Sequence, residues 1–286
     1  LRRGVKVGRD VSVAELRAGY DAVLVATGAK DVIPPDAPGS DLTGVFDGYK
    51  FLEDVFIRGV DTYLANPTYD LGKRVLVIGG GNSALDCART ALRLTGGDVT
   101  MVNRRTEAEM PVDKVLVDEG KQEGLTLSFL MAPKLYYGSD GRLEGATMAV
   151  MKLGDVDSSG RRSPVPTGET VDVPCDSVLL AVGRGPNSFL VKQAGLKAGP
   201  KNSVAVDEMC MTSVEGVYAA GDVVTGETLV VKAMAKGRDA AQRIHESLTR
   251  QEKAHKSLYD YYFTRRTSGF YYRDMLDEKE DRLPPT

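Results

Sequence analysis

The chain has 286 residues, of which 42% are hydrophobic, and its 37 basic residues nearly balance 40 acidic ones. This length and composition fit one large or two medium folded domains, and the missing basic excess argues against a nucleic-acid partner. No apolar run reaches the roughly 18 residues of a membrane span, and the first residues lack the apolar core of a signal peptide. We therefore expect a protein of the cytoplasm.

The three cysteines, Cys87, Cys175 and Cys210, lie far apart and form no C-x-x-C pair. A dithiol redox centre or a four-cysteine iron–sulfur cluster within the chain is therefore not expected. Three separate thiols in an acidic protein suit a reducing compartment. The two histidines, His245 and His255, are too few for a histidine-based metal site, so no metal site is predicted.

The first predicted strand covers residues 21–28, a continuous apolar run that ends in small residues. Such a run is typical of a buried strand in a parallel sheet. Apolar residues at helical spacing predict a helix over 48–66, which Pro67 ends. Residues 73–78 then predict a second buried strand.

A β-α-β unit begins at this second strand. Its glycine turn leads into a helix over 83–94, and a strand follows at 98–103. Another helix is predicted over 112–123. Residues 125–152 are typical of a strand-rich segment with a turn at residues 139–141, whereas the polar residues 154–170 predict a loop.

Two later segments repeat the ending of the first strand, an apolar run followed by small residues. They cover 177–183 and 216–222, and a helix is predicted over 228–248. Strands that alternate with helices predict an α/β fold with parallel sheets. The order of the motifs predicts two nested Rossmann-like domains: a discontinuous domain at 1–70 and 184–248, an inserted domain at 71–183, and a tail at 249–286.

A glycine-rich turn lies directly between the strand at 73–78 and the following helix, which is the context that a dinucleotide turn requires. Gly79 permits the tight turn, Gly81 lets the backbone approach a pyrophosphate, and Ala84 allows close helix packing. Backbone N–H groups at the helix start then face the phosphates. The alternative is a glycine turn that only packs tightly. The predicted nucleotide-binding residues are Gly79, Gly80, Gly81, Asn82, Ser83 and Ala84.

Residues about 20 positions past the turn determine whether such a site prefers NAD or NADP. An acidic residue there would bind the ribose 2′-OH of NAD, but the sequence has Asn103, Arg104 and Arg105. Two guanidinium groups suit a 2′-phosphate, which favours NADP and leaves NAD open. Alternatively, the two arginines form a solvated basic pair, and Glu107 or Glu109 could bind one of them.

These motifs, in this order, are similar to those of the glutamate synthase small (β) subunit. The same arrangement recurs in the N-terminal half of dihydropyrimidine dehydrogenase and in electron-bifurcating ferredoxin:NADP oxidoreductases. The resemblance covers roughly residues 20–248. The residues that carry it are Ala26, Thr27 and Gly28, the run 79–89, Asn103, Arg104 and Arg105, Met110 and Pro111, Ala181, Val182 and Gly183, Pro186 and Asn187, and the run 217–224.

The resemblance implies two cofactors, NADP(H) in the inserted domain and FAD in the surrounding one. Gly221 and Asp222 match the second FAD motif, in which the Asp binds the ribityl chain. The helix start at Thr228, Leu229 and Val230 would lie near the isoalloxazine ring, where a helix N-terminus stabilises negative charge. The resemblance also places Ala26, Thr27, Gly28 and Gly183 among the cofactor-binding residues.

The family begins with a cysteine-rich region for iron–sulfur clusters and a first glycine-rich turn for FAD, and this chain contains neither. We therefore expect an incomplete FAD site, completed by an N-terminal segment or by an iron–sulfur-containing subunit of a larger oxidoreductase complex. Hydride would pass from NADPH to FAD, and electrons would continue to the iron–sulfur partner. This chemistry belongs to the cofactors, so no catalytic side chain is assigned.

The tail is rich in aromatic residues interleaved with arginines, a composition typical of interface hot spots. It is expected either to dock onto a partner subunit or to pack on the chain's own body, and its many acids argue against a single-stranded nucleic-acid surface. Two other functions compete with this interpretation. A thioredoxin-reductase-like protein would need a C-x-x-C pair, which is absent. A nucleotide-binding scaffold or sensor without turnover is the alternative function.

Overall fold

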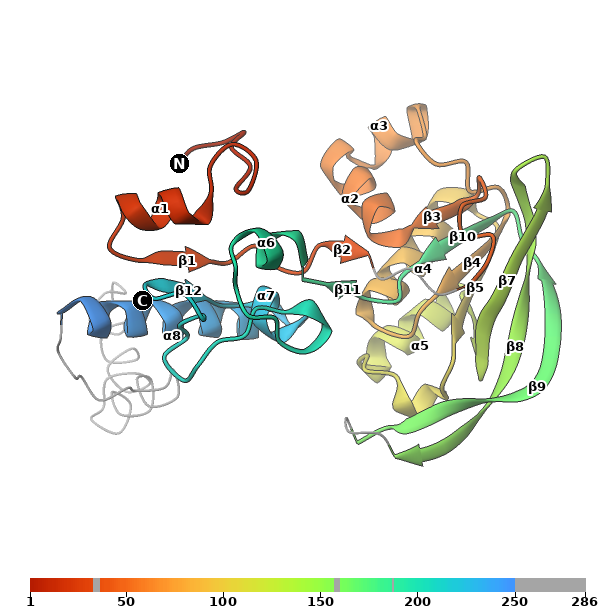
Figure 1. Ribbon diagram of the computed structural model, residues 1–286. Coiled ribbons are helices and arrows are strands. Elements are labelled where there is room, and N and C mark those ends of the chain that lie inside the picture. Colours follow the sequence, from red (N-terminus) through yellow and green to blue (C-terminus); the bar gives the residue numbers. More distant parts are fainter. Residues whose placement is uncertain (33–36, 157–159, 187, 250–286) are drawn as a thin grey trace, which may run out of the picture. The chain divides into compact units, whose positions relative to one another are not determined.

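The computed structural model describes residues 1–32, 37–156, 160–186 and 188–249 (Figure 1). The predicted docking tail therefore lies outside the described residues, except for Thr249. Contacts between Cα atoms divide the chain into two compact units. Unit 1 contains residues 1–31 and the chain from Arg184 onward, and unit 2 contains residues 32–183. The α/β fold with parallel sheets is confirmed.

Unit 2 is built on a five-stranded sheet in which every neighbouring pair of strands is parallel. Successive residues of the central strand face two different cores. Val75 and Val77 pack with the helices, whereas Leu76 and Ile78 pack with a second sheet. Burial on both faces explains the continuous apolar run. The order is β3 (Val45–Asp47), β10 (Ser177–Leu180), β4 (Arg74–Ile78), β5 (Asp98–Asn103), β6 (Thr126–Phe129).

Helices cover one face of this sheet (Figure 1). They are α2 (Gly48–Arg58), α3 (Val60–Ala65), α4 (Asn82–Thr95) and α5 (Lys114–Gln122), with a 3₁₀ turn at Glu107–Glu109. The single helix predicted over 48–66 is wrong, because Gly59 has φ 79° and ψ 149° and separates α2 from α3. Gly96 ends α4 in the left-handed conformation, as the sequence predicts.

An antiparallel three-stranded sheet covers the other face. It contains β7 (Met131–Ser139), β8 (Arg142–Val156) and β9 (Arg162–Pro174), with the predicted turn between β7 and β8. The loop predicted over 154–170 is wrong, because β8 reaches Val156 and most of the remainder belongs to β9. Exposed polar side chains and three prolines make this strand difficult to recognise in the sequence. Among the described residues, its backbone pairs with β8 alone, since it lies at the edge of the sheet.

The division between the units also differs from the predicted boundary after residue 70. Residues 32–70 belong to unit 2, because β3 pairs with β10 and because Phe51 and Val55 of α2 are buried in the same core as Leu85 of α4. These contacts connect elements far apart in the sequence. They could not be inferred from the order of the motifs.

Unit 1 brings together the two ends of the described chain. Strand β1 (Val23–Val25) pairs in parallel with β12 (Val217–Ala219), so that Val23 lies opposite Val217. This pairing agrees with the nested order of the motifs. The prediction of a buried first strand is wrong for Leu24, which is 40% exposed, because β1 has one neighbouring strand among the described residues.

The other elements of unit 1 surround a small apolar core that includes Val13, Val25 and Val217. No helix in the described part of the chain is long and apolar enough to cross a membrane. The elements are α1 (Val13–Gly19), α6 (Ser188–Gln193), a 3₁₀ turn at Pro200–Asn202, α7 (Asp222–Thr225) and α8 (Val230–Thr249). Strands β2 (Asp31–Val32) and β11 (Arg184–Gly185) pair where the chain passes between the units.

Candidate dinucleotide-binding sites

The predicted glycine turn connects β4 to α4, and its geometry requires small residues. The Gly79 N–H donates to the carbonyl of Val102 at 3.0 Å, which ties the turn to β5. A Cβ atom on Gly79 would lie 2.9 Å from the Cβ of Ala84, which is itself fully buried. Close approach of α4 to β4 therefore depends on a glycine at 79 and a small residue at 84.

The start of α4 is open on the side that a phosphate would approach. Gly81 is the N-cap of α4, and it has no side chain to bond the first amides of the helix. A Cβ atom at this position would meet nothing within 4 Å. The fourteen-residue helix also places the positive end of its dipole here. Of the other predicted residues, Asn82 is exposed and Ser83 is half-buried.

The end of β5 lies directly against this turn. A Cβ atom on Gly80 would come within 2.6 Å of the side-chain amide of Asn103, which is buried. The Asn103 Oδ1 accepts a hydrogen bond from the Arg105 N–H at 3.2 Å. The residue that follows β5 is therefore placed next to the turn, where a side chain can contact the adenosine ribose of a bound dinucleotide.

The two arginines predicted for the 2′-phosphate lie in different environments. Arg104 is exposed, whereas Arg105 is 8% exposed and donates its Nε–H to the carbonyl of Arg162 at 2.9 Å. The expectation of a solvated pair is therefore wrong for Arg105, whose side chain packs towards β9. Glu107 forms an ion pair with Lys121 at 2.8 Å.

Glu109 forms its ion pair with Arg162, at 2.9 Å. Arg162 was not among the predicted site residues, because residues 154–170 were predicted to be a loop. The available indication was the run Gly160, Arg161 and Arg162, which repeats the double arginine at the end of β5.

A second group of predicted residues comes together in unit 1. The Ala220 N–H donates to the carbonyl of Val25 at 3.1 Å, which places the end of β12 beside Ala26, Thr27 and Gly28. Gly28 has φ 71° and Gly221 has φ 76°, and a Cβ on either glycine would meet nothing within 4 Å. The group therefore combines left-handed glycines with open space at two adjacent strand ends.

Asp222 connects this group to the start of α8. Its Oδ1 accepts a hydrogen bond from the Thr228 hydroxyl at 2.8 Å. The carbonyl of Leu229 then accepts from the N–H groups of Lys232 and Ala233, so that α8 begins there, with Val230 75% exposed. The structure thus brings Thr228, just before α8, into contact with Asp222.

Gly183 belongs to a different place from the other predicted glycines. It lies in unit 2, two residues after Ala181, and has φ 98°. The Ala181 N–H donates to the carbonyl of Ile78 at 2.8 Å, so this part of the chain follows the strand that neighbours the nucleotide turn. Binding of a cofactor at any of these residues remains a prediction.

The comparison with known proteins decides the family. Residues 2–237 match the family described as pyridine nucleotide-disulphide oxidoreductase. The chain belongs to this family. Similarity extends to the NADP(+)-dependent formate dehydrogenase subunit beta of Moorella thermoacetica, which is 39% identical over 253 residues. That match covers 87% of this chain and 34% of the relative.

A glutamate synthase [NADPH] small chain from Azospirillum brasilense is 37% identical over 250 residues, which cover 84% of this chain and 51% of the relative. The similarity to glutamate synthase small subunits is therefore confirmed. The chain spans between one third and about one half of the length of these two relatives. Among solved structures, Mycobacterium tuberculosis FprA in complex with NADPH has a TM-score of 0.67 at 22% identity and covers 86% of this chain and 67% of that one, which shows a shared fold.

The cysteines of this pyridine nucleotide-disulphide oxidoreductase do not form a disulphide. Cys87 and Cys175 are buried, and Cys210 is half-buried. Burial raises the pKa of the Cys87 thiol and raises the pKa of Cys175 to about 12. Because the thiolate is the reactive species, these two thiols are unsuited to disulfide exchange.

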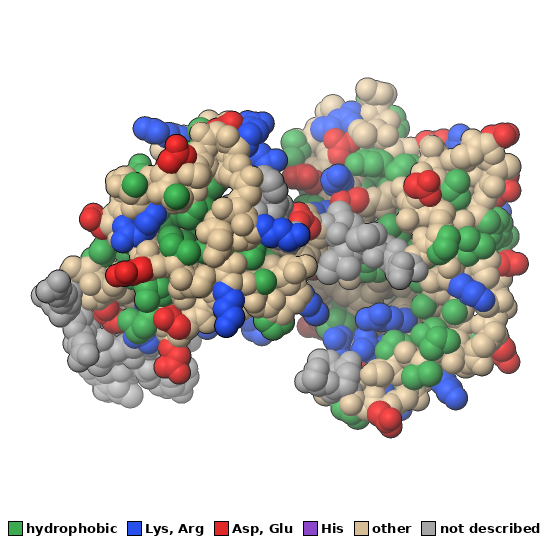
Figure 2. All heavy atoms as spheres, in the orientation of Figure 1, with side chains coloured by type: hydrophobic (Ala, Val, Ile, Leu, Met, Phe, Trp, Pro, Cys, Tyr) green, Lys and Arg blue, Asp and Glu red, His purple; other side chains and the backbone are tan. Residues whose placement is uncertain are grey.

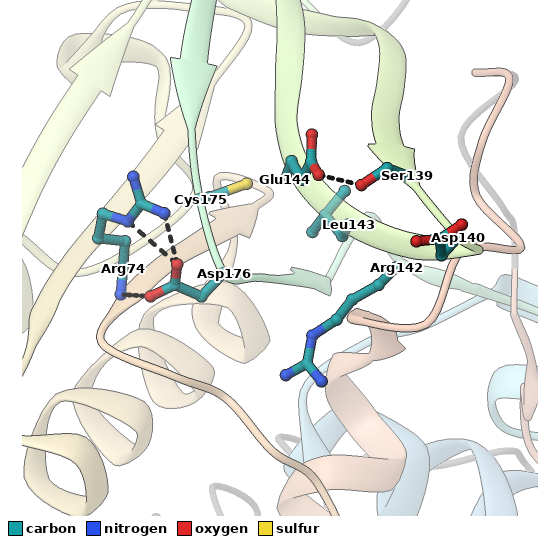
Figure 3. A pocket seen from close by; sticks show the side chains of 8 residues that line it. All are labelled: Arg74, Ser139, Asp140, Arg142, Leu143, Glu144, Cys175 and Asp176. Atoms are coloured by element: carbon teal, nitrogen blue, oxygen red, sulfur yellow. Dashed lines mark hydrogen bonds and ion pairs between the residues drawn. The ribbon is translucent and has the colours of Figure 1, made fainter.

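A hollow at the other end of the strands, away from the glycine turn, is lined in part by charged residues (Figure 3). Arg74 forms an ion pair with Asp176 at 2.6 Å and holds the pKa of that carboxyl at about 2. Arg142 pairs with Asp70 at 2.8 Å. The hollow lies at the beginning of β4 and β10, whereas nucleotides bind beyond the carboxyl ends of parallel strands. Both of its arginines are held in ion pairs, and we do not assign it to a cofactor.

Proposed function

We propose that this chain is part of an NAD(P)H-dependent flavin oxidoreductase and that residues 79–84 hold the pyrophosphate of NADP(H). The observation that supports this most directly is the open start of α4 at Gly81, next to a turn whose glycines have no room for side chains. Backbone N–H groups and the helix dipole are suited to bind a diphosphate there. The names of similar proteins, which refer to NADP(+) and NADPH, agree with this assignment.

The preference for NADP over NAD rests on the residues that follow β5. Asn103 occupies the end of the strand, and no acid stands there to bind a ribose 2′-OH. Arg104 is exposed directly beyond it, where a guanidinium can bind phosphate oxygens in a fork. NAD remains the alternative nicotinamide cofactor.

The residues of unit 1 fit one part of an FAD molecule. Gly28 and Gly221 leave a space that Cβ atoms would fill, and Asp222 presents a carboxylate held by Thr228. We propose that Ala26, Thr27, Gly28, Gly221 and Asp222 contact FAD. Leu229 and Val230 would lie near its ring system, where the start of α8 favours negative charge. When bound, the two cofactors supply hydride transfer from the nicotinamide to the flavin, and the chain contributes binding and orientation.

We propose that another polypeptide segment completes this site. Apolar side chains of unit 1 are strongly exposed along β1 and the first turns of α8, including Leu24, Val231 and Met234. Exposed apolar patches of this kind mark surfaces that other elements cover. We propose that an N-terminal segment or an iron–sulfur-containing subunit covers them and accepts electrons within a larger complex. Both relatives described above carry subunit or small-chain names.

Two further expectations are kept as proposals. The tail at 249–286 would dock onto such a partner, and the complex would work in the cytoplasm. Gly183, which lies in unit 2, would contribute to a cofactor site. The competing function is a nucleotide-binding scaffold or sensor that binds NADP(H) without turnover.

The test is reduction of the bound flavin. The protein would be purified with the subunits that accompany it and titrated with NADPH in the absence of oxygen. Bleaching of the visible flavin absorbance at a stoichiometric amount of NADPH would support the oxidoreductase. A complex that binds NADPH in calorimetry but contains no flavin would support the scaffold instead. No binding of NADPH at all would contradict both functions.

A further inference from the structure

The end of β5 is joined to the hairpin between β8 and β9. The Nε–H of Arg105 donates to the carbonyl of Arg162 at 2.9 Å. In the other direction, the Arg162 Nε binds Glu109 Oε1 at 2.9 Å. These two bonds connect segments that lie 57 and 53 residues apart in the sequence. They hold the start of β9 next to the residues after β5, where the ribose of a bound dinucleotide would lie.

A hollow of about 500 Å³ lies between these two segments. This size falls within the range of small-molecule sites. One part of its wall is apolar and is formed by Ala108, Met110, Pro111 and Val156. The other part contains the two consecutive arginines before and at the start of β9, Arg161 and Arg162. Figure 2 shows a group of Lys and Arg side chains on this part of unit 2.

The two glutamates that follow β5, Glu107 and Glu109, are bound by particular partners. Glu109 accepts bonds from Arg162 and, at 3.0 Å, from the hydroxyl of Thr106, with which it forms a capping box. Glu107 binds Lys121 on α5. Glu109 is the one acid among the described residues that line the hollow. An arginine facing an apolar wall provides both a fork for phosphate oxygens and a flat surface for a purine.

We propose that Arg161 is a specificity-determining residue, which binds the 2′-phosphate of the adenosine end of NADP(H) together with Arg104. Arg162 is then a positioning residue, because its bonds to Glu109 and Arg105 fix the hairpin beside β5. The adenine would lie against Met110 and Pro111. This inference rests on the proposed function, since it assumes that residues 79–84 bind the pyrophosphate.

Two probes that differ only in the 2′-phosphate separate this inference from the proposed function. The full-length protein and its variants would be titrated calorimetrically with adenosine 2′,5′-bisphosphate and with adenosine 5′-monophosphate. Arg161→Gln removes the positive charge and the paired N–H donors of the guanidinium group. The matched control is Arg142→Gln at the start of β8, where the arginine is 67% exposed and lines the hollow that contains Arg74 and Asp176. Thermal unfolding of each variant would check the fold.

For Arg161→Gln we expect about tenfold to a hundredfold weaker binding of the bisphosphate, the loss of one charge-assisted bond, with unchanged binding of the monophosphate. Arg161→Lys should show a smaller loss, and Arg142→Gln none. Equal effects of Arg161→Gln on the two probes, or no effect on either, would overturn the role of Arg161 while leaving the proposed function intact. If the unaltered protein binds neither probe nor NADPH, the proposed function fails and this inference fails with it.

Discussion

Substitution of Gly81 separates nucleotide binding from the stability of the fold. Gly81 has φ −104° and ψ −178°, which is extended backbone that any residue adopts, and a Cβ atom there meets nothing within 4 Å. Asp and Asn are both favoured N-caps, and each should stabilise α4 by a few tenths of a kcal/mol relative to Gly. The two variants Gly81→Asp and Gly81→Asn have nearly the same shape and differ in charge.

The expected loss of affinity follows from the space that the new side chain occupies. In either variant the side chain covers the first amides of α4 and removes at least one phosphate hydrogen bond. A bond to a charged group contributes about 1.5–3 kcal/mol, which corresponds to about tenfold to a hundredfold weaker binding of NADPH. The aspartate adds repulsion of about 1 kcal/mol at 4 Å in water and about 4 kcal/mol at an effective dielectric constant of 20.

The assay combines thermal unfolding without nucleotide and calorimetric titration with NADPH. Both variants should unfold at or above the temperature of the unaltered protein, and affinity should fall from Gly81 to Asn and again to Asp. Gly237→Ala serves as the control, since a Cβ on Gly237 of α8 also meets nothing within 4 Å. A Gly81→Asp variant that folds and binds NADPH as tightly as the unaltered protein would refute the placement of the pyrophosphate.

The remaining predictions concern stability and reactivity. Phe51→Ala should lower the free energy of unfolding by about 3–5 kcal/mol, because Phe51 is fully buried. Phe56→Ala on the same helix should change it little, because Phe56 is 73% exposed. Chemical denaturation of both variants would check this difference. Asp176 has a pKa lowered from 3.8 to about 2 by its arginine, so its stabilisation is present above about pH 4 and is lost as the pH falls through about 2. Asp176→Asn should therefore destabilise the protein by roughly 1 kcal/mol at neutral pH, and the difference should vanish in urea unfolding near pH 2. A maleimide reagent followed by mass spectrometry should label Cys210 before Cys87, because Cys210 is the more accessible of these thiols and burial raises the pKa of Cys87 further above the neutral range. Faster labelling of Cys87 would contradict its burial.

Features that depend on a short run of residues could be predicted from the sequence. The turn at 79–84 needs small residues at fixed spacing between a strand and a helix, and the structure has that local arrangement. The strand endings near Gly28 and Gly221 are also local, and the parallel pairing of β1 with β12 agrees with the nested order of the motifs. These parts share a property: backbone geometry excludes most side chains, so the residue types themselves carry the information.

Features that depend on tertiary contacts were not predictable in the same way. Strand β9 is exposed along most of its length and is held by backbone pairing with β8, so its side chains carry no periodic apolar pattern. Arg104 and Arg105 are identical residues in sequence, yet one is exposed and the other is buried against Arg162. The division into units differs from the predicted boundary for the same reason. Strand β3 belongs to unit 2 because it pairs with a strand more than 130 residues away in the sequence.

The choice of cofactor depends on the register between two buried strands. Ile78 lies opposite Val102 in the parallel pair of β4 and β5, and this register places Gly79 beside Val102 and Gly80 against Asn103. Alternate residues of β4 are buried in two different cores. A shift of one residue in the pairing of β4 with its neighbours would therefore turn its side chains towards the wrong core. Packing on both faces of the sheet therefore fixes the distance between the phosphate turn and the residue after β5. A change of cofactor preference should accordingly require substitutions beyond Asn103 and at the hairpin before β9, while the strands and the turn stay as they are.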